Sequence, residues 1–481
     1  MSFVHEKCKL TMMATKRAIS SASRVRRLSR MALGSHKYAR VERGIYKLIV
    51  DEAIRQGITV LEAGQDNGIS MMAEALLGYV DEPRLTVLQR LGYGLSDVAG
   101  KPSEGSIVVE TGKTLNHQSQ VVHSLSGASV EGLLQKSALM DLKEENIHII
   151  PMVHNPEEHG DDTVSRLTDA FCALEEAVCR GDIPSFGVVS NGFSLPPKHP
   201  LHLDWKSTVL KAACDAAKEI TGNKSNLSIV QLPANILETR GIQVARDLKS
   251  FLNANTISML NLPKTLEIFA MRPLTCYPDQ GTGDGDGFQL IDFPIPTEPG
   301  ITEWTHEMIS PPPVYEATMK RALSHFDATE ILEAKQERKL SEHEEQTIEG
   351  AKILIEMIQG LDRRLESSIT FSQHERELMS NVMPVLEGTF EEIDEQSLEI
   401  LQDFFAAHGL AARYHIARRT RSCSIEGGKD VMPYKIPSNM KMQEFALGQL
   451  LKEQTISKII VGATKPEHVR DTMQIFKQNR D

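Results

Sequence analysis

A short apolar segment that ends in polar side chains occurs repeatedly along the chain. Residues 147–153 are mostly apolar and lead directly into His154, Asn155 and Pro156. A short apolar run bounded by a turn signal predicts a strand that is buried on both faces. A histidine that follows such a strand lies at the rim of the sheet, where side chains meet ligands, although a single histidine there is more often structural. The significance of His154 therefore depends on what surrounds it.

Three further runs have the same form: residues 107–109 before Lys113, residues 186–189 before Ser190 and Asn191, and residues 229–230 before Gln231. Helical stretches, such as 163–179 and 205–220, lie between these runs. Strand, polar end and helix repeated at a spacing of roughly 35 to 45 residues indicate parallel β/α units. In a (β/α)8 barrel all strands end at one mouth, where chemistry is built. The sequence therefore predicts the α/β class and a (β/α)8 TIM barrel.

The chain is too long for the barrel alone. It has 481 residues, whereas a single barrel needs about 250. Residues 278–312 begin with a Gly- and Asp-rich segment and continue with several prolines, which indicates an extended linker. We expect four parts: a basic arm at 1–30, the first part of the barrel at 31–277, a linker with a helical insertion at 278–440, and completion of the barrel at 441–481. The insertion thus precedes the last barrel strand.

The first thirty residues differ in composition from the rest of the chain. No acidic residue occurs in residues 7–41, which contain several arginines and serines. An Arg- and Ser-rich, acid-poor segment is typical of an organelle transit peptide. We expect a mitochondrial presequence that is removed near Met31; a chloroplast address and a disordered basic arm are the alternatives.

Bulk properties exclude several classes of function. The net charge of -12 argues against nucleic acid as the main partner. No uncharged apolar run approaches the roughly 18 to 20 residues of a membrane helix. The six cysteines are scattered, and His199 with His202 has no third ligand nearby. We therefore expect no disulfides, no membrane span and no metal.

Six segments in this order resemble the aldo-keto reductase family: GITVLEAGQDNG, ETGK, IHIIPMVHNPE, FGVVSN, IVQLPANIL and IIVGATKPEHVRDT. The resemblance covers residues 31–277 and resumes at 441–476. It implies an NAD(P)H-dependent oxidoreductase that acts on a carbonyl and alcohol pair, with a small carbonyl or sugar substrate.

The resemblance also implies a catalytic set. Glu62 falls at the family's Asp, Asn67 at its proton-donating Tyr, Lys113 at its Lys and His154 at its His. A general acid must titrate near the working pH. Since an Asn amide can donate a hydrogen bond to an oxyanion but cannot deliver a proton, Asn67 marks a departure from the family.

Three interpretations of Asn67 follow. The protein is an altered reductase in which His154 or Lys113 donates the proton, or a barrel that binds cofactor without turnover. In the third, Tyr79 or Tyr93 approaches from another element, which we disfavour because both lie on later segments than the strand end.

The implied cofactor site is only partly family-like. Ser190, Asn191 and Gln231 match the residues that bind the nicotinamide carboxamide. Met271 stands where an aromatic residue usually stacks on the nicotinamide, and Arg272 either faces the pyrophosphate or is a solvated charge. The remaining positions follow the predicted last strand, residues 459–461, and open a helix suited to phosphate: Thr464, Lys465, His468, Arg470 and Asp471. Their positive groups favour NADPH over NADH.

Helices are predicted within 313–424. Ala351, Leu354, Ile358, Leu361 and Leu365 repeat at spacings of three and four, which indicates a short heptad-like seam. These helices pack on each other or on the barrel, or else form a lid or a docking surface for a protein partner. The alternative to an enzyme is therefore a non-catalytic barrel that serves as a subunit or cofactor-sensing partner in a mitochondrial assembly.

Overall fold

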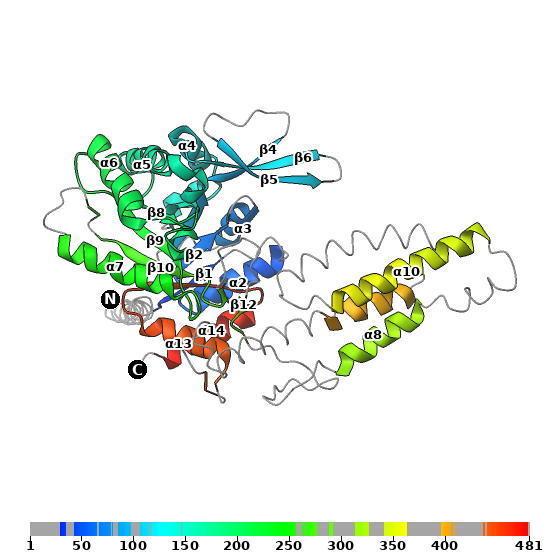
Figure 1. Ribbon diagram of the computed structural model, residues 1–481. Coiled ribbons are helices and arrows are strands. Elements are labelled where there is room, and N and C mark those ends of the chain that lie inside the picture. The colour runs from blue at the N-terminus through cyan, green and yellow to red at the C-terminus, as the bar shows by residue number, and fades with distance from the viewer. Residues whose placement is uncertain are drawn as a thin grey trace, which may run out of the picture. The chain divides into compact units, whose positions relative to one another are not determined.

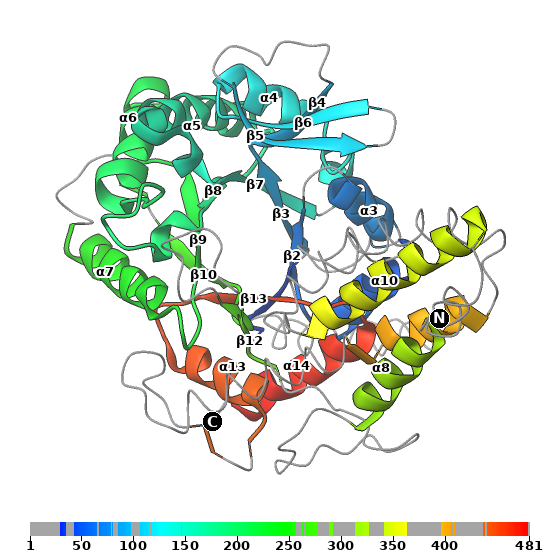
Figure 2. The same ribbon diagram turned by 45° about the vertical axis from the view of Figure 1, so that its right-hand side comes forward.

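Eight parallel strands close into a barrel in the computed structural model, in the order β1-β13-β10-β9-β8-β7-β3-β2. Figure 2 shows the ring of strands with helices outside it. The structure describes residues 29–34, 43–64, 67–77, 79, 85–97, 106–114, 117–145, 147–255, 262–263, 265–276, 288–291, 313–326, 341–362, 396–405, 407–408, 436–437 and 440–479. The predicted (β/α)8 barrel is confirmed.

The barrel strands are short, as their apolar runs indicate. They are β1 (Met31–Gly34), β2 (Val60–Ala63), β3 (Leu85–Leu91), β7 (Ile147–His154), β8 (Phe186–Val189), β9 (Leu227–Pro233), β10 (Glu267–Met271) and β13 (Lys458–Gly462). All eight contribute to one buried apolar cluster, in which Leu88, Met152 and Phe269 are among the larger members. This cluster fills the barrel, so the interior is a packed core and not a pore.

One predicted strand was wrong. Residues 107–109 belong to β5 (Ser106–Thr114), which pairs antiparallel with β6 (His117–Ser124). With β4 (Tyr93–Asp97) they form a separate three-stranded sheet. Polar residues and glycine make up six of the nine residues of β5 (Ser, Glu, two Thr, Gly and Lys), whereas β3 is buried along most of its length. A parallel barrel strand must be apolar on both faces, and β3 meets that condition better.

The outer helices follow amphipathic patterns. They are α2 (Arg43–Arg55), α3 (Asn67–Leu76), α4 (Gly127–Gln135), α5 (Thr163–Arg180), α6 (Lys211–Ile220), α7 (Thr239–Asn255), α13 (Met442–Lys452) and α14 (Pro466–Gln478). In α5, Leu167, Phe171 and Leu174 recur at spacings of three and four and are buried. The helix ends at Gly181, whose positive φ of 76° is the usual helix-ending conformation.

The barrel closes where β13 enters between β1 and β10. Arg30 stabilises this closure, because its guanidinium donates to the carbonyls of Leu451, Glu453 and Ile456 at 2.5, 2.8 and 2.5 Å. These carbonyls lie at or just beyond the end of α13, where helix carbonyls lack partners within the helix. Lys458 donates to the Ser29 carbonyl at 2.5 Å. Ser29 and Arg30 therefore belong to the barrel.

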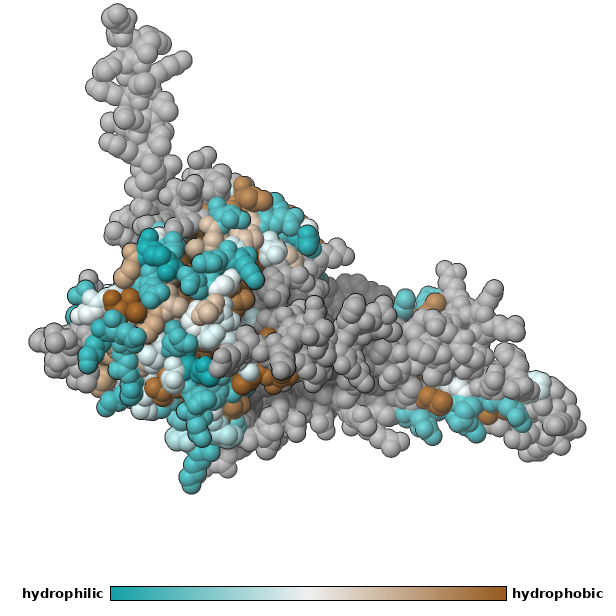
Figure 3. Space-filling model, turned by 90° about the horizontal axis from the view of Figure 1, so that it is seen from above, coloured by the Kyte–Doolittle hydropathy of each residue, from teal (hydrophilic) through white to brown (hydrophobic). Residues whose placement is uncertain are grey.

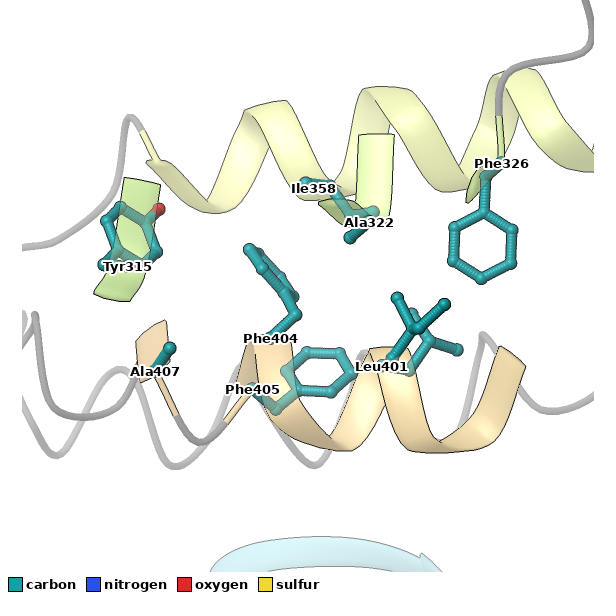
Figure 4. Packing of buried hydrophobic residues seen from close by; sticks show 9 residues of the cluster. Tyr315, Ala322, Phe326, Ile358, Leu401, Phe404, Phe405 and Ala407 are labelled. Atoms are coloured by element: carbon teal, nitrogen blue, oxygen red, sulfur yellow. The ribbon is translucent and has the colours of Figure 1, made fainter. Parts of the chain in front are cut away.

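The chain divides into two compact units, Met1–Pro273 with Ala446–Asp481, and Leu274–Phe445. The second contains α8 (Pro313–His325), α10 (Glu342–Asp362) and helical residues 396–405. Figure 4 shows their apolar side chains gathered in one cluster, with Tyr315, Ile358 and Phe404 among them. Of the predicted seam, Ile358 joins this cluster and Ala351 is buried. The side chains of Leu354, Leu361 and Leu365 lie outside the described residues.

The helices of the second unit therefore bury apolar surface against each other. A strand pair, β11 (Thr275–Cys276) and β12 (Phe288–Gln289), also belongs to this unit. Figure 1 labels β12.

Among the described residues, no helix is both long and apolar enough to cross a membrane. On the face seen in Figure 3, the coloured hydrophobic residues occur in small groups between hydrophilic ones. Within the same described residues, no group of three or more His, Cys, Asp and Glu side chains could hold a metal ion.

Candidate active site

Four barrel strands place a polar side chain above the apolar core, near their carboxyl ends. The core residues Val60, Leu88, Met152 and Ile229 point into the barrel. Residues two apart on a strand share a face. The inward-facing residues two positions further along are Glu62, Arg90, His154 and Gln231, here called the mouth layer. Each lies within two residues of the end of its strand, so the four side chains converge where barrel enzymes carry their chemistry.

Glu62 organises the mouth layer. One of its carboxylate oxygens, Oε1, accepts from Nε and Nη2 of Arg90 at 3.1 and 2.9 Å and from Nε2 of Gln231 at 2.8 Å. The side chains of Arg90 and Glu62 are only 11% and 3% exposed. Buried charges of opposite sign and several hydrogen bonds hold this arrangement in one geometry.

Glycine at position 34 leaves room for the carboxylate. A Cβ atom added at Gly34 would lie 2.7 Å from Cγ2 of Ile460 and 3.6 Å from Oε2 of Glu62. Glycine at this position therefore lets β1 lie close to the Ile460 side chain of β13 and to the Glu62 carboxylate.

Arg90 also contacts His154, with Nη1 lying 3.3 Å from Nε2 of the imidazole. The structure thus brings together Glu62 and His154 as the resemblance implied, but supplies the cation from β3. Lys113, implied to be the catalytic lysine, lies in β5 opposite Gln118 of β6. Asn67 is the first residue of α3, and its side chain lies outside the described residues.

Sequence reasoning missed Arg90. The segment LTVLQRL is a mostly apolar run that ends at Gly92, which is the pattern of a barrel strand. An arginine inside such a short run, however, argues against a buried strand. The neighbouring carboxylate of Glu62 compensates the buried charge of Arg90 in this strand.

Tyr93 lies beside the His154 side chain of this layer. Its ring lies 5.1 Å from that of His154 in an edge-to-face arrangement. Its hydroxyl oxygen is 3.1 Å from Nδ2 of Asn155, and the hydroxyl donates to Glu158 at 3.4 Å. Burial raises the pKa of Tyr93, and Glu158 and Glu157 add to the effect, so the phenol keeps its proton. Tyr79 instead donates to Asp51 at 2.7 Å.

Tyr93 thus lies close to His154 although it stands on a later segment of the chain. The third interpretation of Asn67, in which such a tyrosine takes part, stays a prediction. Gly92 makes this approach feasible with its φ of 125°; a Cβ atom there would lie 2.7 Å from Nε2 of His123.

Two further histidines fix the three-stranded sheet to the end of β7. Nε2 of His123 is 2.7 Å from the carbonyl oxygen of His154, and Nδ1 is 3.0 Å from Nε2 of His159. A carbonyl only accepts, so Nε2 of His123 carries the proton, and His159 donates to Nδ1. Burial lowers the pKa of His123 to about 4, in keeping with this neutral form.

Behind the mouth layer, Ser190 is held by a buried glutamate. Its hydroxyl donates to Oε2 of Glu157 at 2.7 Å and accepts from the Gly192 amide at 2.8 Å. The Gly192 amide also lies 2.9 Å from Oε1 of Glu157. Burial raises the pKa of Glu157 to about 7, although these hydrogen bonds oppose the shift.

Of the residues implied to bind a nicotinamide carboxamide, Gln231 and Asn191 are of the right type for that group, whereas the Ser190 hydroxyl is already engaged by Glu157 and Gly192. Gln231 is fully buried, and its Oε1 has no hydrogen-bond partner among the described residues. A buried acceptor without a partner is costly unless a ligand supplies a donor. Met271 packs against the same side chain, with its sulfur 3.7 Å from Nε2 of Gln231. An amide NH2 group would satisfy Gln231, and the Asn191 side chain beside Ser190 is of the right type for the amide oxygen.

Arg272 has an acidic partner of its own. Nη2 donates to Oε1 of Glu238 at 2.6 Å, and Asn235 donates to the carbonyl of Arg272 at 3.2 Å. Its φ of 55° is left-handed, as is the 47° of Asn155 after β7. Such strain is found at functional ends of structural elements. The Glu238 carboxylate thus balances the charge of Arg272 within the protein.

The five positions near the C-terminus that the resemblance assigns to cofactor binding lie at the start of α14, after β13. They are Thr464, Lys465, His468, Arg470 and Asp471. Thr464 and His468 lie together, with Oγ1 and Nδ1 3.3 Å apart. Lys465 precedes the helix and makes no side-chain cap. Pro466 has no amide hydrogen, and the His468 amide donates to the carbonyl of Lys465 at 3.2 Å. Arg470, however, pairs with Glu467 at 2.7 Å and with Glu52 at 3.6 Å. Asp471 is exposed.

No protein-family model matches the chain, and no curated protein does either. Among solved structures it is similar to a protein of Pseudomonas aeruginosa whose own assignment to the aldo-keto reductases is provisional. The identity is 11%, the TM-score is 0.30, and the match covers 52% of this chain and 76% of the other. A likeness of this size carries no functional argument, so function must be argued from the mouth layer.

Proposed function

We propose that the barrel binds a nicotinamide dinucleotide and catalyses oxidoreduction of a carbonyl and alcohol pair, in the manner of an aldo-keto reductase with an altered catalytic set. The observation that carries this proposal is the mouth layer, which combines a buried ion pair, an imidazole and an amide oxygen without a partner. When bound, the cofactor would supply or accept hydride. The chain's own residues orient the two reactants and stabilise charge on the substrate oxygen.

The cofactor would be held from two sides. Gln231 and Asn191 would bind the carboxamide, and the start of α14 would take a phosphate. Lys465 and His468 give that end of α14 positive character, which favours NADPH over NADH. Arg272 contributes less than its charge suggests, because Glu238 already neutralises it.

Calorimetric titration of the full chain with NADPH and then NADH tests this proposal. Gln231→Leu removes the acceptor and should weaken binding about tenfold, which equals about 1.4 kcal/mol. Gln89→Leu is the matched control, because Gln89 is an equally buried glutamine in β3 that binds Ser137 at 2.9 Å. No heat with either nucleotide would refute the proposal, and so would equal loss in both variants.

A second candidate is a non-catalytic barrel that acts as a subunit or cofactor sensor. The Tyr93 hydroxyl favours it, since Asn155 and Glu158 already engage that group. In this case a protein partner would bind through the 313–424 helices. NADPH binding without turnover of any aldehyde, ketone or sugar alcohol would support this candidate, and turnover would exclude it.

We also propose a mitochondrial location, which the basic N-terminal segment supports. Ser29 and Arg30 contact the barrel, so removal of a presequence should occur before Ser29 rather than at Met31. N-terminal sequencing of the mature protein from isolated mitochondria tests this. A mature chain that begins at or after Met31 would contradict the proposed cleavage position.

A further inference from the structure

We infer that Arg90, and not His154, binds the carbonyl oxygen of the substrate. The inference rests on the proposed function and extends it to the group that polarises the reacting bond. It differs from what the family resemblance implies, in which the histidine polarises the carbonyl.

The contact between Arg90 and His154 defines the protonation state of the imidazole. A guanidinium has only donors, so Nε2 of His154, 3.3 Å from Nη1 of Arg90, must be the acceptor. The neutral imidazole then carries its proton on Nδ1. In this state the Nε2 atom of His154 has no proton to offer to a carbonyl oxygen.

Arg90 retains donors that His154 lacks. A guanidinium has five N–H groups, of which Nε, Nη2 and Nη1 each use one on Glu62 or His154. The other two (five minus three) make no hydrogen bond within the described part of the chain. Both belong to a nearly buried group whose orientation is fixed by two neighbouring strands. Fixed donors at a developing oxyanion are the arrangement that accelerates carbonyl chemistry.

Charge balance then limits the substrate. Glu62 neutralises Arg90, and Glu238 neutralises Arg272. A substrate carboxylate would meet the Glu62 carboxylate beside Arg90 and would gain little net attraction. The site therefore suits an uncharged carbonyl. In its reduction, the bound cofactor would supply hydride to the carbonyl carbon and would itself be oxidised. Arg90 would hold the oxygen that receives the π electron pair, and a solvent water would give that oxygen its proton and leave as hydroxide.

Binding of 4-nitrobenzaldehyde to the NADP⁺-loaded full chain tests the inference without turnover, by saturation-transfer NMR. Arg90→Met should weaken binding at least tenfold, whereas His154→Asn should change it less than twofold. Since Arg90→Met removes the cation that balances the Glu62 carboxylate, the double variant Glu62→Gln with Arg90→Met is measured beside it and should lose binding equally. Unchanged binding in both Arg90 variants would overturn the inference, as would no binding to the wild type. Failure of NADP⁺ itself to bind would instead refute the proposed function.

The protonation state gives a second measurement that does not depend on cofactor or activity. In ¹⁵N-histidine spectra of the full chain, with His154 assigned through His154→Asn, Nδ1 should be protonated and Nε2 bare. A protonated Nε2 would overturn the inference. Finally, 4-carboxybenzaldehyde should bind more weakly than 4-nitrobenzaldehyde, and Glu62→Gln should reduce or reverse that preference because it releases the charge of Arg90. An unchanged preference would contradict the charge argument.

Discussion

Nε and Nη2 of Arg90 both donate to the same carboxylate oxygen of Glu62, at 3.1 and 2.9 Å. This buried pair joins the neighbouring strands β2 and β3 on the inside of the barrel. Two charges removed from water are tolerated only together, because either one alone would lack compensation.

Replacing Glu62 by alanine should therefore destabilise the protein strongly. We expect a loss of about 3–5 kcal/mol in the free energy of unfolding, measured by urea denaturation. Glu74→Ala is the control, since Glu74 pairs with Arg43 at 3.6 Å where both side chains are more than half exposed (60% and 74%). That variant should change stability by less than about 0.5 kcal/mol. Similar losses in the two variants would show that the Glu62 pair is not specially costly to break.

Gly34→Ala should destabilise the seam between β1 and β13. The added methyl group would lie 2.7 Å from Ile460 Cγ2, and overpacking of this kind costs about 1–3 kcal/mol. Gly462 is the register partner of Gly34, and a Cβ atom there meets nothing within 4 Å. Gly462→Ala should accordingly stay within about 0.5 kcal/mol of the wild type in thermal and urea unfolding. The prediction fails if both alanine variants unfold alike.

Glu157 should make stability depend on pH. Its pKa is raised from 4.5 to about 7 in the folded protein, so the folded state holds this proton more tightly than the unfolded chain. The contribution is complete below pH 4.5 and is lost as the pH rises to about 7. Relative to the wild type, Glu157→Gln should thus gain unfolding free energy steadily from pH 4.5 to 7. A difference that is flat across this range would contradict the raised pKa.

His123 should act in the opposite direction. Its pKa is lowered from 6.5 to about 4, so the unfolded chain takes up this proton first. Its contribution is complete above pH 6.5 and is lost as the pH falls to about 4. Glutamine can still donate to the His154 carbonyl but does not titrate, so His123→Gln should become more stable relative to wild type as the pH falls through this range. Melting temperatures of both proteins between pH 4 and 7.5 provide the test, and parallel curves would count against it.

Much of the barrel was predictable because most of its strands end in a recognisable way. Residues 147–153, 186–189 and 229–230 are short apolar runs followed by polar residues, and all became barrel strands. His154 and Gln231 could then be placed together by the rule that parallel strands share one mouth, and the family resemblance added Glu62.

The rest depended on contacts that no local pattern contains. Arg90 argues against a buried position for β3 in the barrel, because a local sequence pattern does not show that the Glu62 carboxylate lies beside the guanidinium. Lys113 follows an apolar run, but the turn at Gly92 sends the chain into a separate antiparallel sheet. The same turn carries Tyr93 to His154. The commitment of Ser190 to Glu157 likewise arises only from folding.

The entry of β13 between β1 and β10 also sets the order in which the protein can be completed during translation. Met31 pairs with Ile459, 428 residues later (459 minus 31). Until β13 leaves the ribosome, β1 and β10 each present an open strand edge, and such edges recruit other chains. Synthesis of the whole second unit falls within that interval. A nascent chain of this protein therefore carries both open edges from the synthesis of β10 until that of β13, and premature termination between these two strands would leave both edges exposed permanently.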